Sequence, residues 1–356
     1  MKLSLSQKRK LVSTSRITGG GILLALIYPV FADGFSEPIA YINALVIGLL
    51  GGLIISAVEL EIFDSQKRKF SFLQNFWLKT FTYFFFFALL ILIVMGFNES
   101  IYYNVGFWEH ITSTKFRNFI FEEDYIVILV YSLFFIGIII FSRQMSIKMG
   151  QGVLLSYITG RFHEPKEVER IFMYLDLRSS TTIAEKLGDI RYHEFLHEFF
   201  HDITGSILLT KGNIYRYVGD QVTVTWKYRE GLKNGSCIRT YFLIKHKLNK
   251  LKEKYLIRYG FIPKFSTCFH CGNVIIGEIG DVKSQIVYHG EVLYQTAAIE
   301  KKAAELNEEV LLSESLIKKI SLPSLYTTPK IGCINKDNYN LDIYTIREQN
   351  DVNFRQ

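Results

Sequence analysis

Four long uncharged segments in the first 143 residues constrain the fold of this chain more than any other feature. They span Ile17–Ala32, Pro38–Val58, Thr80–Phe97 and Tyr125–Ser142. About 20 apolar residues cross a hydrocarbon core of roughly 30 Å, so each segment has a suitable length, although the first is on the short side. Buried helices of a soluble domain are the alternative, but four such segments leave that domain too little polar face. The sequence therefore predicts a four-helix transmembrane domain over residues 1–143.

The distribution of Lys and Arg predicts how these segments are oriented. Segment 33–37 carries only acidic charge and segment 98–124 is mainly acidic. Basic residues instead precede the first apolar segment, lie between the second and the third, and follow the fourth: Lys2, Lys8, Arg9, Lys10, Arg16, Lys67–Lys69, Arg143 and Lys148. The positive-inside rule places both termini in the cytoplasm. We expect a multi-pass protein of the inner (cytoplasmic) membrane with its second half in the cytoplasm. A signal peptide cleaved after Val30-Phe-Ala32 is an alternative for the first segment, and it leaves the second half inside.

Net charge and cysteine content exclude two classes of function. The chain has 41 basic and 34 acidic residues, a net charge of +7, spread over both halves. Nucleic-acid binding would need a clustered basic stripe, so no nucleic-acid partner is expected. The four cysteines lie in the predicted cytoplasmic part, which disfavours structural disulfides. Cys268-Phe-His-Cys271 has the spacing of half a zinc site, but a second pair is lacking, and we interpret it as structural.

The second half alternates predicted strands and helices, which is typical of an α+β fold. Segment 144–168 is predicted to be a helical linker. The helices are expected at 181–209, 236–257 and 292–306, with a further short helix from Leu311. The strands are expected at 170–177, 214–218, 221–226, 264–270, 274–278, 285–288, 330–333 and 341–346. Such an order is consistent with a ferredoxin-like core.

Two short stretches of this half each end an apolar strand in one carboxylate. Phe172–Ser180 contains Asp176 at the end of its apolar run, and Tyr215–Trp226 contains Asp220 within the two-residue connection of a predicted hairpin. Mg²⁺ prefers one or two carboxylates together with phosphate oxygens of a substrate. Two such ions about 3.5–4 Å apart activate a nucleophile and a leaving group together. The predicted chemistry is metal-assisted phosphoryl transfer on a nucleotide.

Three ordered motifs resemble the catalytic domain of class III adenylate/guanylate cyclases, in particular the membrane-anchored bacterial subtype. They are Leu175-Asp-Leu-Arg-Ser-Ser-Thr-Thr-Ile-Ala-Glu-Lys-Leu187, Tyr217-Val-Gly-Asp220 and Gly277-Glu-Ile-Gly280. The resemblance covers about residues 165–350. It implies a ferredoxin-like cyclase domain, here assigned to residues 169–350, after the transmembrane domain and the linker.

The resemblance also implies a metal and substrate site. Asp176, Asp220 and the carbonyl group of Leu177 match the positions that bind two Mg²⁺ or Mn²⁺ ions in the family. Ser179 and Thr181 lie in the following loop and helix start, where hydroxyl and amide groups would contact a triphosphate. Helix capping is an alternative and compatible role for Ser179.

The chain departs from the family at several other positions. Arg216 stands where active members have a base-recognising lysine, and Val287 stands at the base-selecting position. Tyr294 and Ala298 stand where the family has the asparagine and arginine that orient the ribose and stabilise the transition state. A transition-state arginine contributes about 10³–10⁵ in rate. Metal binding is therefore expected to be retained, whereas no intact catalytic asparagine or arginine is expected.

The resemblance implies a dimer, because family sites form between two catalytic domains. We expect a membrane-bound enzyme that converts a nucleoside triphosphate, most simply ATP, to cyclic AMP and pyrophosphate. Low intrinsic activity, or activity that depends on a second cyclase subunit, follows from the two departures on the late helix. The alternative is a degenerate cyclase that serves as a nucleotide-binding or dimerising signalling module.

Overall fold

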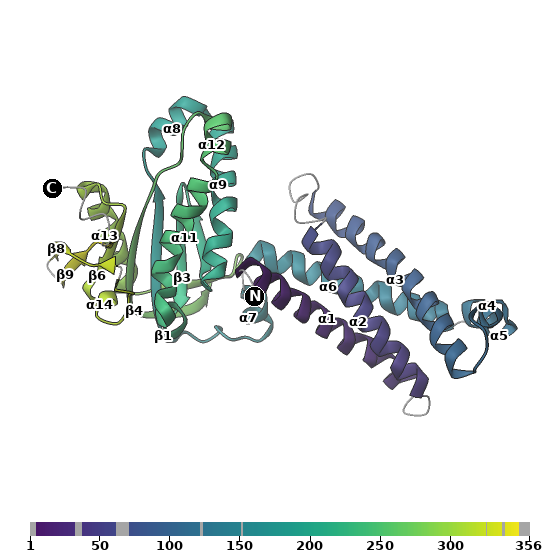
Figure 1. Cartoon of the computed structure of the whole chain (residues 1–356). Coiled ribbons are helices and arrows are strands. Elements are labelled where there is room, and N and C mark those ends of the chain that lie inside the picture. Colours follow the sequence, from purple (N-terminus) through teal and green to yellow (C-terminus); the bar gives the residue numbers. More distant parts are fainter. Residues whose placement is uncertain are drawn as a thin grey trace. The chain divides into compact units, whose positions relative to one another are not determined.

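The computed structural model divides the chain into two compact units, Met1–Lys148 and Met149–Gln356 (Figure 1). It describes residues 5–32, 38–61, 71–121, 124–150, 152–324, 326–336 and 339–348. The predicted basic loop Lys67–Lys69 and the acidic loop 33–37 lie outside these ranges. Each unit is described separately.

The regular elements of unit 1, within its described residues, are all helices. Its elements are α1 (Leu5–Ala32), α2 (Pro38–Glu61), α3 (Phe72–Tyr102), α4 (Phe107–Thr112), α5 (Thr114–Phe121) and α6 (Asp124–Met149). Within the described part, three helices are long and apolar enough to cross a membrane, at Pro38–Val58, Phe72–Tyr102 and Tyr125–Met149. The apolar part of α1, Ile17–Phe31, is shorter. Three of the four predicted spans are thus supported, and the first remains an expectation.

Helix α3 begins eight residues before the predicted segment at Thr80. Ser71 caps it: the Ser71 hydroxyl accepts a hydrogen bond from the Gln74 backbone at 3.2 Å, and the Gln74 side chain accepts one from the Ser71 backbone at 2.9 Å. This reciprocal capping box satisfies two backbone donors at the helix start. The polar turn therefore belongs to the helix, although hydropathy alone excludes it.

Glycines allow α1 and α2 to approach closely. A Cβ atom on Gly48 would lie 2.7 Å from the Ile22 Cα atom, and one on Gly52 would lie 2.5 Å from the Thr18 Cα atom. Both obstacles are backbone atoms, which cannot rotate away. Gly48 and Gly52 are spaced by four on α2, the small-residue spacing that favours close helix contacts in membranes.

Unit 2 is built on one sheet that consists, within the described residues, of eight strands. The strand order is β2-β3-β1-β4-β6-β9-β8, with β5 paired to β4 beside this path. The main strands are β1 (Lys166–Leu177), β2 (Asn213–Val218), β3 (Gln221–Lys227), β4 (Phe265–Ile279), β5 (Gln285–His289), β6 (Val310–Ser313), β8 (Lys330–Lys336) and β9 (Tyr339–Tyr344). β4 and β6 are parallel, and the other pairs are antiparallel. β7 (Tyr326–Thr327) and β10 (Arg347–Glu348) form a separate pair.

Helices complete unit 2 (Figure 1). They are α7 (Val153–Ile158), α8 (Ser180–Leu187), α9 (Asp189–Leu209), α10 (Tyr228–Leu232), α11 (Ser236–Lys250), α12 (Lys252–Tyr259), α13 (Glu291–Leu306) and α14 (Glu314–Ile317), with a 3-10 turn at Lys233–Gly235. Side chains alternate between the two faces of a strand. In β1, Met173 and Leu175 belong to the core that includes residues of α9 and α11. Phe172 and Tyr174 belong to the core that includes residues of α13. By the same alternation, the Asp176 side chain lies on the face of the sheet that carries Phe172 and Tyr174.

Two predicted helices are each divided in the structure. The helix predicted over 181–209 is interrupted at Gly188, which adopts a φ of +72° between α8 and α9. Glycine alone adopts this conformation without a steric cost. The helix predicted over 236–257 is interrupted at Leu251, between α11 and α12. Apolar spacing continues across both interruptions, so periodicity did not reveal them.

The two strands predicted at 264–270 and 274–278 are one strand, β4. Its ladder with β1 runs without a break from the Leu177–Phe265 pair to the Lys166–Ile276 pair. Gly272 stands between the two predicted strands, and it makes room for Val292 of α13, which would lie 2.6 Å from a Cβ atom there. The short helix predicted from Leu311 is preceded by strand β6 and begins at Glu314.

Candidate functional site

Asp176 lies at the end of β1, where the sheet gives way to a loop. It pairs in register with Ser266 of β4. The ladder ends one residue later at Leu177, and the Arg178 amide then donates to the Lys264 carbonyl at 2.9 Å. Strand β1 lies between β3 and β4, but its ladder with β3 ends at the Leu175–Val222 pair, so Asp176 is held by pairing with β4. The carboxylate therefore lies one residue beyond the part of β1 that is paired on both sides.

Asp220 lies in the tight turn that joins β2 and β3. Val218 pairs with Gln221, which leaves Gly219 and Asp220 as the connection, and Gly219 adopts a φ of +61°. Because β3 is the direct neighbour of β1, the turn reaches the end of β1. The predicted hairpin is confirmed, and the two aspartates are brought together.

The two carboxyl groups act on each other electrostatically. Burial is the largest cause of a raised pKa for Asp176. Burial, the charge of Asp220 and a hydrogen bond between the two side chains together bring this pKa to about 6. Hydrogen bonding from the Leu177 backbone opposes this effect. An acidic group with a raised pKa lies where negative charge is unfavourable. A cation between the two groups would reverse that effect.

Glu300 of α13 is a third acidic group at this site, and sequence reasoning missed it. Burial raises its pKa to about 7, and the charges of Asp176 and Asp220 contribute to the increase. The Gln221 side chain donates a hydrogen bond to the Glu300 carboxylate, which lowers the pKa in part. Glu300 follows buried Thr296 by four residues, so helical spacing was a signal that it faces the sheet.

The donor set suits Mg²⁺ or Mn²⁺. Asp176, Asp220 and the Leu177 carbonyl group offer oxygen atoms, which these hard cations prefer. Within the described residues, no group of three His, Cys, Asp or Glu side chains is arranged to hold a metal on its own. Two carboxylates and a carbonyl are the partial set expected where a nucleotide supplies the remaining oxygens. The residues present therefore fit the ions implied by the sequence.

The loop after β1 presents hydroxyl groups beside the two aspartates. Ser179 is exposed, adopts a φ of 58° and makes no side-chain cap hydrogen bond with any described residue, so its capping role is not realised. Thr181, in the first turn of α8, is exposed as well. Burial and the Asp220 charge raise the pKa of Tyr192 on α9, and a hydrogen bond with Ser180 opposes them. Tyr192 is a second site residue that the sequence did not reveal.

Arg216 of β2 lies close to Tyr174 on the same side of the sheet. Burial raises the pKa of Tyr174 to about 12, and the charge and hydrogen bond of Arg216 oppose this increase. The guanidinium carbon also lies 5.4 Å from the centre of the Tyr215 ring. Arg216 is thus held beside Tyr174 and Tyr215 by contacts within its own unit.

Known proteins are similar to this chain in sequence and in fold. Adenylate cyclase 2 of Rhizobium meliloti (strain 1021) is 34% identical over 205 residues, which are 58% of this chain and 56% of that protein. The chain thus spans about half the length of this relative. The structure of a bacterial light-regulated adenylyl cyclase matches with 20% identity and a TM-score of 0.51, over 62% of this chain and 65% of that chain. The chain therefore contains a fold similar to that of a cyclase catalytic domain. No protein-family model matches the chain.

The two positions that the sequence analysis predicts to be departures from the family, Tyr294 and Ala298, lie on one face of α13. Tyr294 is 77% exposed and Ala298 is half-buried, four residues later. Residues spaced by four lie one above the other on a helix. The buried side of α13 is formed by other residues, Val292, Thr296, Ile299 and Ala303. The methyl group of Ala298 offers neither a charge nor a hydrogen bond to a phosphate.

Val287, the predicted base-selecting position of the cyclase domain, lies on β5 and pairs with Gly277 of β4. An aliphatic side chain there cannot hydrogen-bond an adenine or guanine edge.

The four cysteines are all free within the described part, and Cys268 and Cys271 are buried. Burial raises the pKa of both thiols, in agreement with a structural role.

Proposed function

We propose that this protein is a membrane-bound class III nucleotide cyclase that converts ATP to cyclic AMP and pyrophosphate. The observation that supports the proposal best is the pairing of Asp176 and Asp220 at the end of β1, in a cyclase fold. The reaction forms a bond from the ribose 3′ oxygen to the α-phosphorus and breaks the bond from that phosphorus to the β-phosphate oxygen. The 3′ hydroxyl loses its proton, and pyrophosphate leaves.

In this proposal Asp176, Asp220 and the Leu177 carbonyl hold two Mg²⁺ or Mn²⁺ ions. When bound, such ions acidify the attacking hydroxyl and neutralise charge on the leaving group. Ser179, Thr181 and the first amides of α8 contact the triphosphate, because helix N-termini favour anions. Arg216 lies close to Tyr174 and contributes positive charge toward the substrate.

The rate of turnover is proposed to be low, or to depend on a second subunit. Tyr294 and Ala298 lack the amide and the cation that the family uses for the ribose and the transition state. Electrostatic stabilisation of developing charge is usually the largest single contribution to catalysis. A homodimer would lack these groups at both sites, whereas a heterodimer with another cyclase would regain them at one.

The same two residues favour a second candidate function. A protein with an intact metal pair and no transition-state arginine would bind a nucleotide without converting it. We propose this nucleotide-binding or dimerising signalling module as the alternative, because the departures at Tyr294 and Ala298 occur together on one helix face.

The membrane placement is proposed from the sequence and from the three apolar helices of unit 1. Both termini would lie in the cytoplasm and the cyclase domain would have access to cytoplasmic ATP. Localisation would be the inner (cytoplasmic) membrane.

The experiment that separates the two candidates incubates the purified full-length protein with Mn²⁺ and ATP, and separately with GTP. Mass spectrometry then measures the cyclic product, with the Asp176→Asn variant as control. Cyclic AMP that is formed by the wild type and not by the variant supports the enzyme. ATP binding without product, alone and with a second cyclase present, supports the module.

A further inference from the structure

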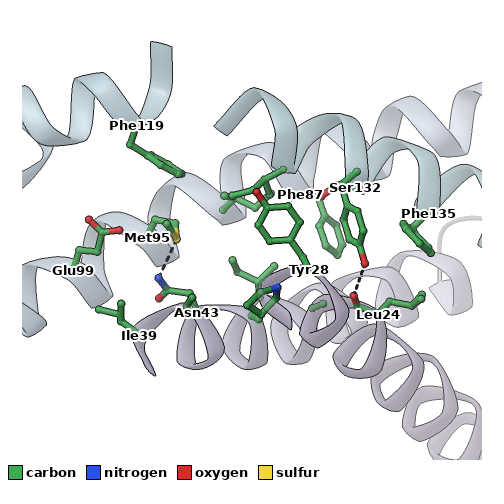
Figure 2. A pocket seen from close by; sticks show the side chains of 18 of the residues that line it. Leu24, Tyr28, Ile39, Asn43, Phe87, Met95, Glu99, Phe119, Ser132 and Phe135 are labelled. Atoms are coloured by element: carbon green, nitrogen blue, oxygen red, sulfur yellow. Dashed lines mark hydrogen bonds between the residues drawn. The ribbon is translucent and has the colours of Figure 1, made fainter. Parts of the chain in front are cut away.

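A cavity within unit 1 plays no part in the proposed reaction. Its volume is about 640 Å³, and residues of α1, α2, α3, α5 and α6 line it (Figure 2). Small-molecule sites typically have volumes of about 300–1,000 Å³ and are mostly apolar, with a few convergent polar groups. The cavity has a volume in this range, an apolar part and a polar part.

Aromatic and aliphatic side chains form one part of the wall. Phe87, Phe119 and Phe135 are among them, and Figure 2 shows these rings around the cavity. The wall is held in place by its own contacts. The Tyr131 hydroxyl donates to the Leu24 carbonyl at 2.8 Å, which joins α6 to α1 across 107 residues of sequence. The apolar part is therefore already formed in the structure.

A buried amide group forms the polar part. Asn43 of α2 is only 4% exposed and lines the cavity. Its oxygen accepts a hydrogen bond from the Asn98 side chain at 2.8 Å. Its Nδ2 donates to the Met95 sulfur at 3.0 Å, as the dashed line in Figure 2 shows. A thioether is a weak acceptor, so this buried donor is poorly satisfied and would gain from an oxygen acceptor.

Charged groups lie at the same end. Glu99 is paired with His110, whose Nε2 lies 3.3 Å from a carboxylate oxygen of Glu99. The Lys115 ammonium lies 3.8 Å from the centre of the Tyr103 ring, and both residues line the cavity. Because the Glu99 carboxylate already lies beside His110, Lys115 supplies the positive charge among the residues that line the cavity. This end comes from segment 98–124, which the charge pattern places outside the cytoplasm.

We propose that this cavity binds a lipophilic small molecule with one hydrogen-bond-accepting head group, a carbonyl or a carboxylate. The apolar body of the molecule packs against the aromatic wall. The head accepts a hydrogen bond from Asn43 Nδ2, with Lys115 nearby. The cavity is a site separate from the nucleotide site of unit 2, and its occupancy does not require turnover.

The test uses the full-length protein in lipid nanodiscs and three diazirine-bearing probes of 12 carbons: a methyl ketone, a carboxylate and a hydrocarbon without a head group. Labelled peptides are mapped by mass spectrometry, with unlabelled ketone or carboxylate as competitor. We expect saturable labelling of Phe87–Met95 and Phe119–Phe135 by a probe with a head group. Asn43→Leu should raise the Kd about three- to tenfold, the range for one lost neutral hydrogen bond.

Adjacent residues provide a matched control. Ala44 lines the cavity and is buried, whereas Leu45 is 48% exposed and does not line it. Ala44→Trp should abolish saturable labelling and Leu45→Trp should leave it unchanged, with helical content and melting temperature as the check on folding. If Ala44→Trp does not fold, Ser132→Leu is the second cavity-filling variant. Tighter binding of the ketone probe would show that the head group is neutral. Tighter binding of the carboxylate probe, with that preference lost in Lys115→Gln, would show that the head group is anionic.

Non-saturable labelling, or equal labelling of Ala44→Trp and Leu45→Trp, would overturn the proposal, because it would show only partition into the surrounding lipid. The measurement is independent of cyclic nucleotide formation. Its failure is therefore distinct from failure of the proposed cyclase activity.

Discussion

The carboxyl group of Asp176 lies beside that of Asp220 in a partly buried position, and burial with the neighbouring charge raises its pKa. The energetic disadvantage of this arrangement is removed by a divalent cation. It is also reduced when one carboxylate becomes an amide. Substitution of either aspartate is therefore expected to weaken ligand binding without unfolding the protein.

We predict that Asp176→Asn and Asp220→Asn each reduce the affinity for Mn²⁺-ATP by at least about tenfold, as for the loss of a charged hydrogen-bond partner. Neither change should lower the melting temperature of the metal-free protein, because each relieves repulsion. Calorimetric titration and thermal melting measure the two effects. Asp281→Asn, in the exposed turn after β4, is the control. Unchanged affinity in both site variants would refute the assignment.

A second residue-scale prediction concerns the contact of α1 with α2. Gly48→Ala should lower the free energy of unfolding by about 1–3 kcal/mol, because the new methyl group meets the Ile22 backbone. Gly19→Ala has open space among the described residues and should be neutral or stabilising by up to about 1 kcal/mol. Circular dichroism melting of the full-length protein in nanodiscs tests both. Equal effects of the two changes would contradict the close approach.

At the scale of elements, α9 and α12 are joined by an ionic network. Glu198 of α9 accepts from the Tyr259 hydroxyl at 2.6 Å and pairs with Lys254 at 2.7 Å, and both partners are on α12. Burial alone would raise the pKa of Glu198, but the hydrogen bonds of Lys254 and Tyr259 hold it below its usual value. The network fixes the helix that follows the interruption at Leu251.

The stabilising effect of Glu198 should therefore depend on pH. Its pKa is lower in the folded protein, so its contribution is present above the unfolded value of about 4.3 and is lost as pH falls through the folded value. Glu198→Gln should lower the free energy of unfolding by about 1–3 kcal/mol at pH 7. The difference from wild type should shrink below about pH 4. Melting curves across this range test it, with exposed Glu253→Gln as control; a difference that does not change with pH would contradict the mechanism.

Helix α13 supports a prediction about activity. Tyr294→Asn with Ala298→Arg should raise cyclase activity, by up to about 10³-fold if the arginine reaches the transition state. The increase should require Asp176 and Asp220, because the restored groups act on metal-bound nucleotide. Cyclic AMP formation by the double variant, with and without Asp176→Asn, is the measurement. A folded, dimeric variant that binds Mn²⁺-ATP but is no faster than wild type would show that this helix is misaligned with the family, or that Arg216 or Val287 prevents the productive pose.

Local patterns predicted the elements that hold the two aspartates. The apolar run before Asp176 and the Gly219-Asp220 turn each identify their element without reference to the rest of the chain. The interruption at Gly188 was missed because apolar spacing continues across it. The continuity of β4 through Gly272 was missed because it depends on a packing partner, Val292, that is distant in sequence. Glu300 was missed for the same reason: its place beside Asp176 is decided by how α13 crosses the sheet.

At the scale of the whole molecule, the sequence predicted one apolar and one α+β part. The structure has two compact units with that division of character. Three of the predicted spans are supported by length and composition, while the first is shorter because the charged residues Arg16 and Asp33 bound it in the sequence. Hydropathy predicts such segments well, because a bilayer forces every spanning backbone into one kind of element.

The topology leads to the final prediction. A phosphatase fusion at position 110 should be active, because that enzyme matures outside the cytoplasm, and a fluorescent protein fused after residue 356 should fluoresce inside. The basic residues on either side of the apolar segments are the physical reason. Reporter assays in intact bacteria measure both. The opposite pattern would invert the orientation of the chain.

The exposure of Tyr294 has a consequence for the history of such proteins. A position that contributes little to the core can change at almost no cost in stability, whereas a shift of one residue within β1 would exchange its two faces and unfold the sheet. Catalytic rate and structural integrity can therefore diverge over generations. A lineage that has lost turnover would still inherit the fold and the pair of aspartates, and changes on one helix would bring a descendant closer to the reaction without unfolding it.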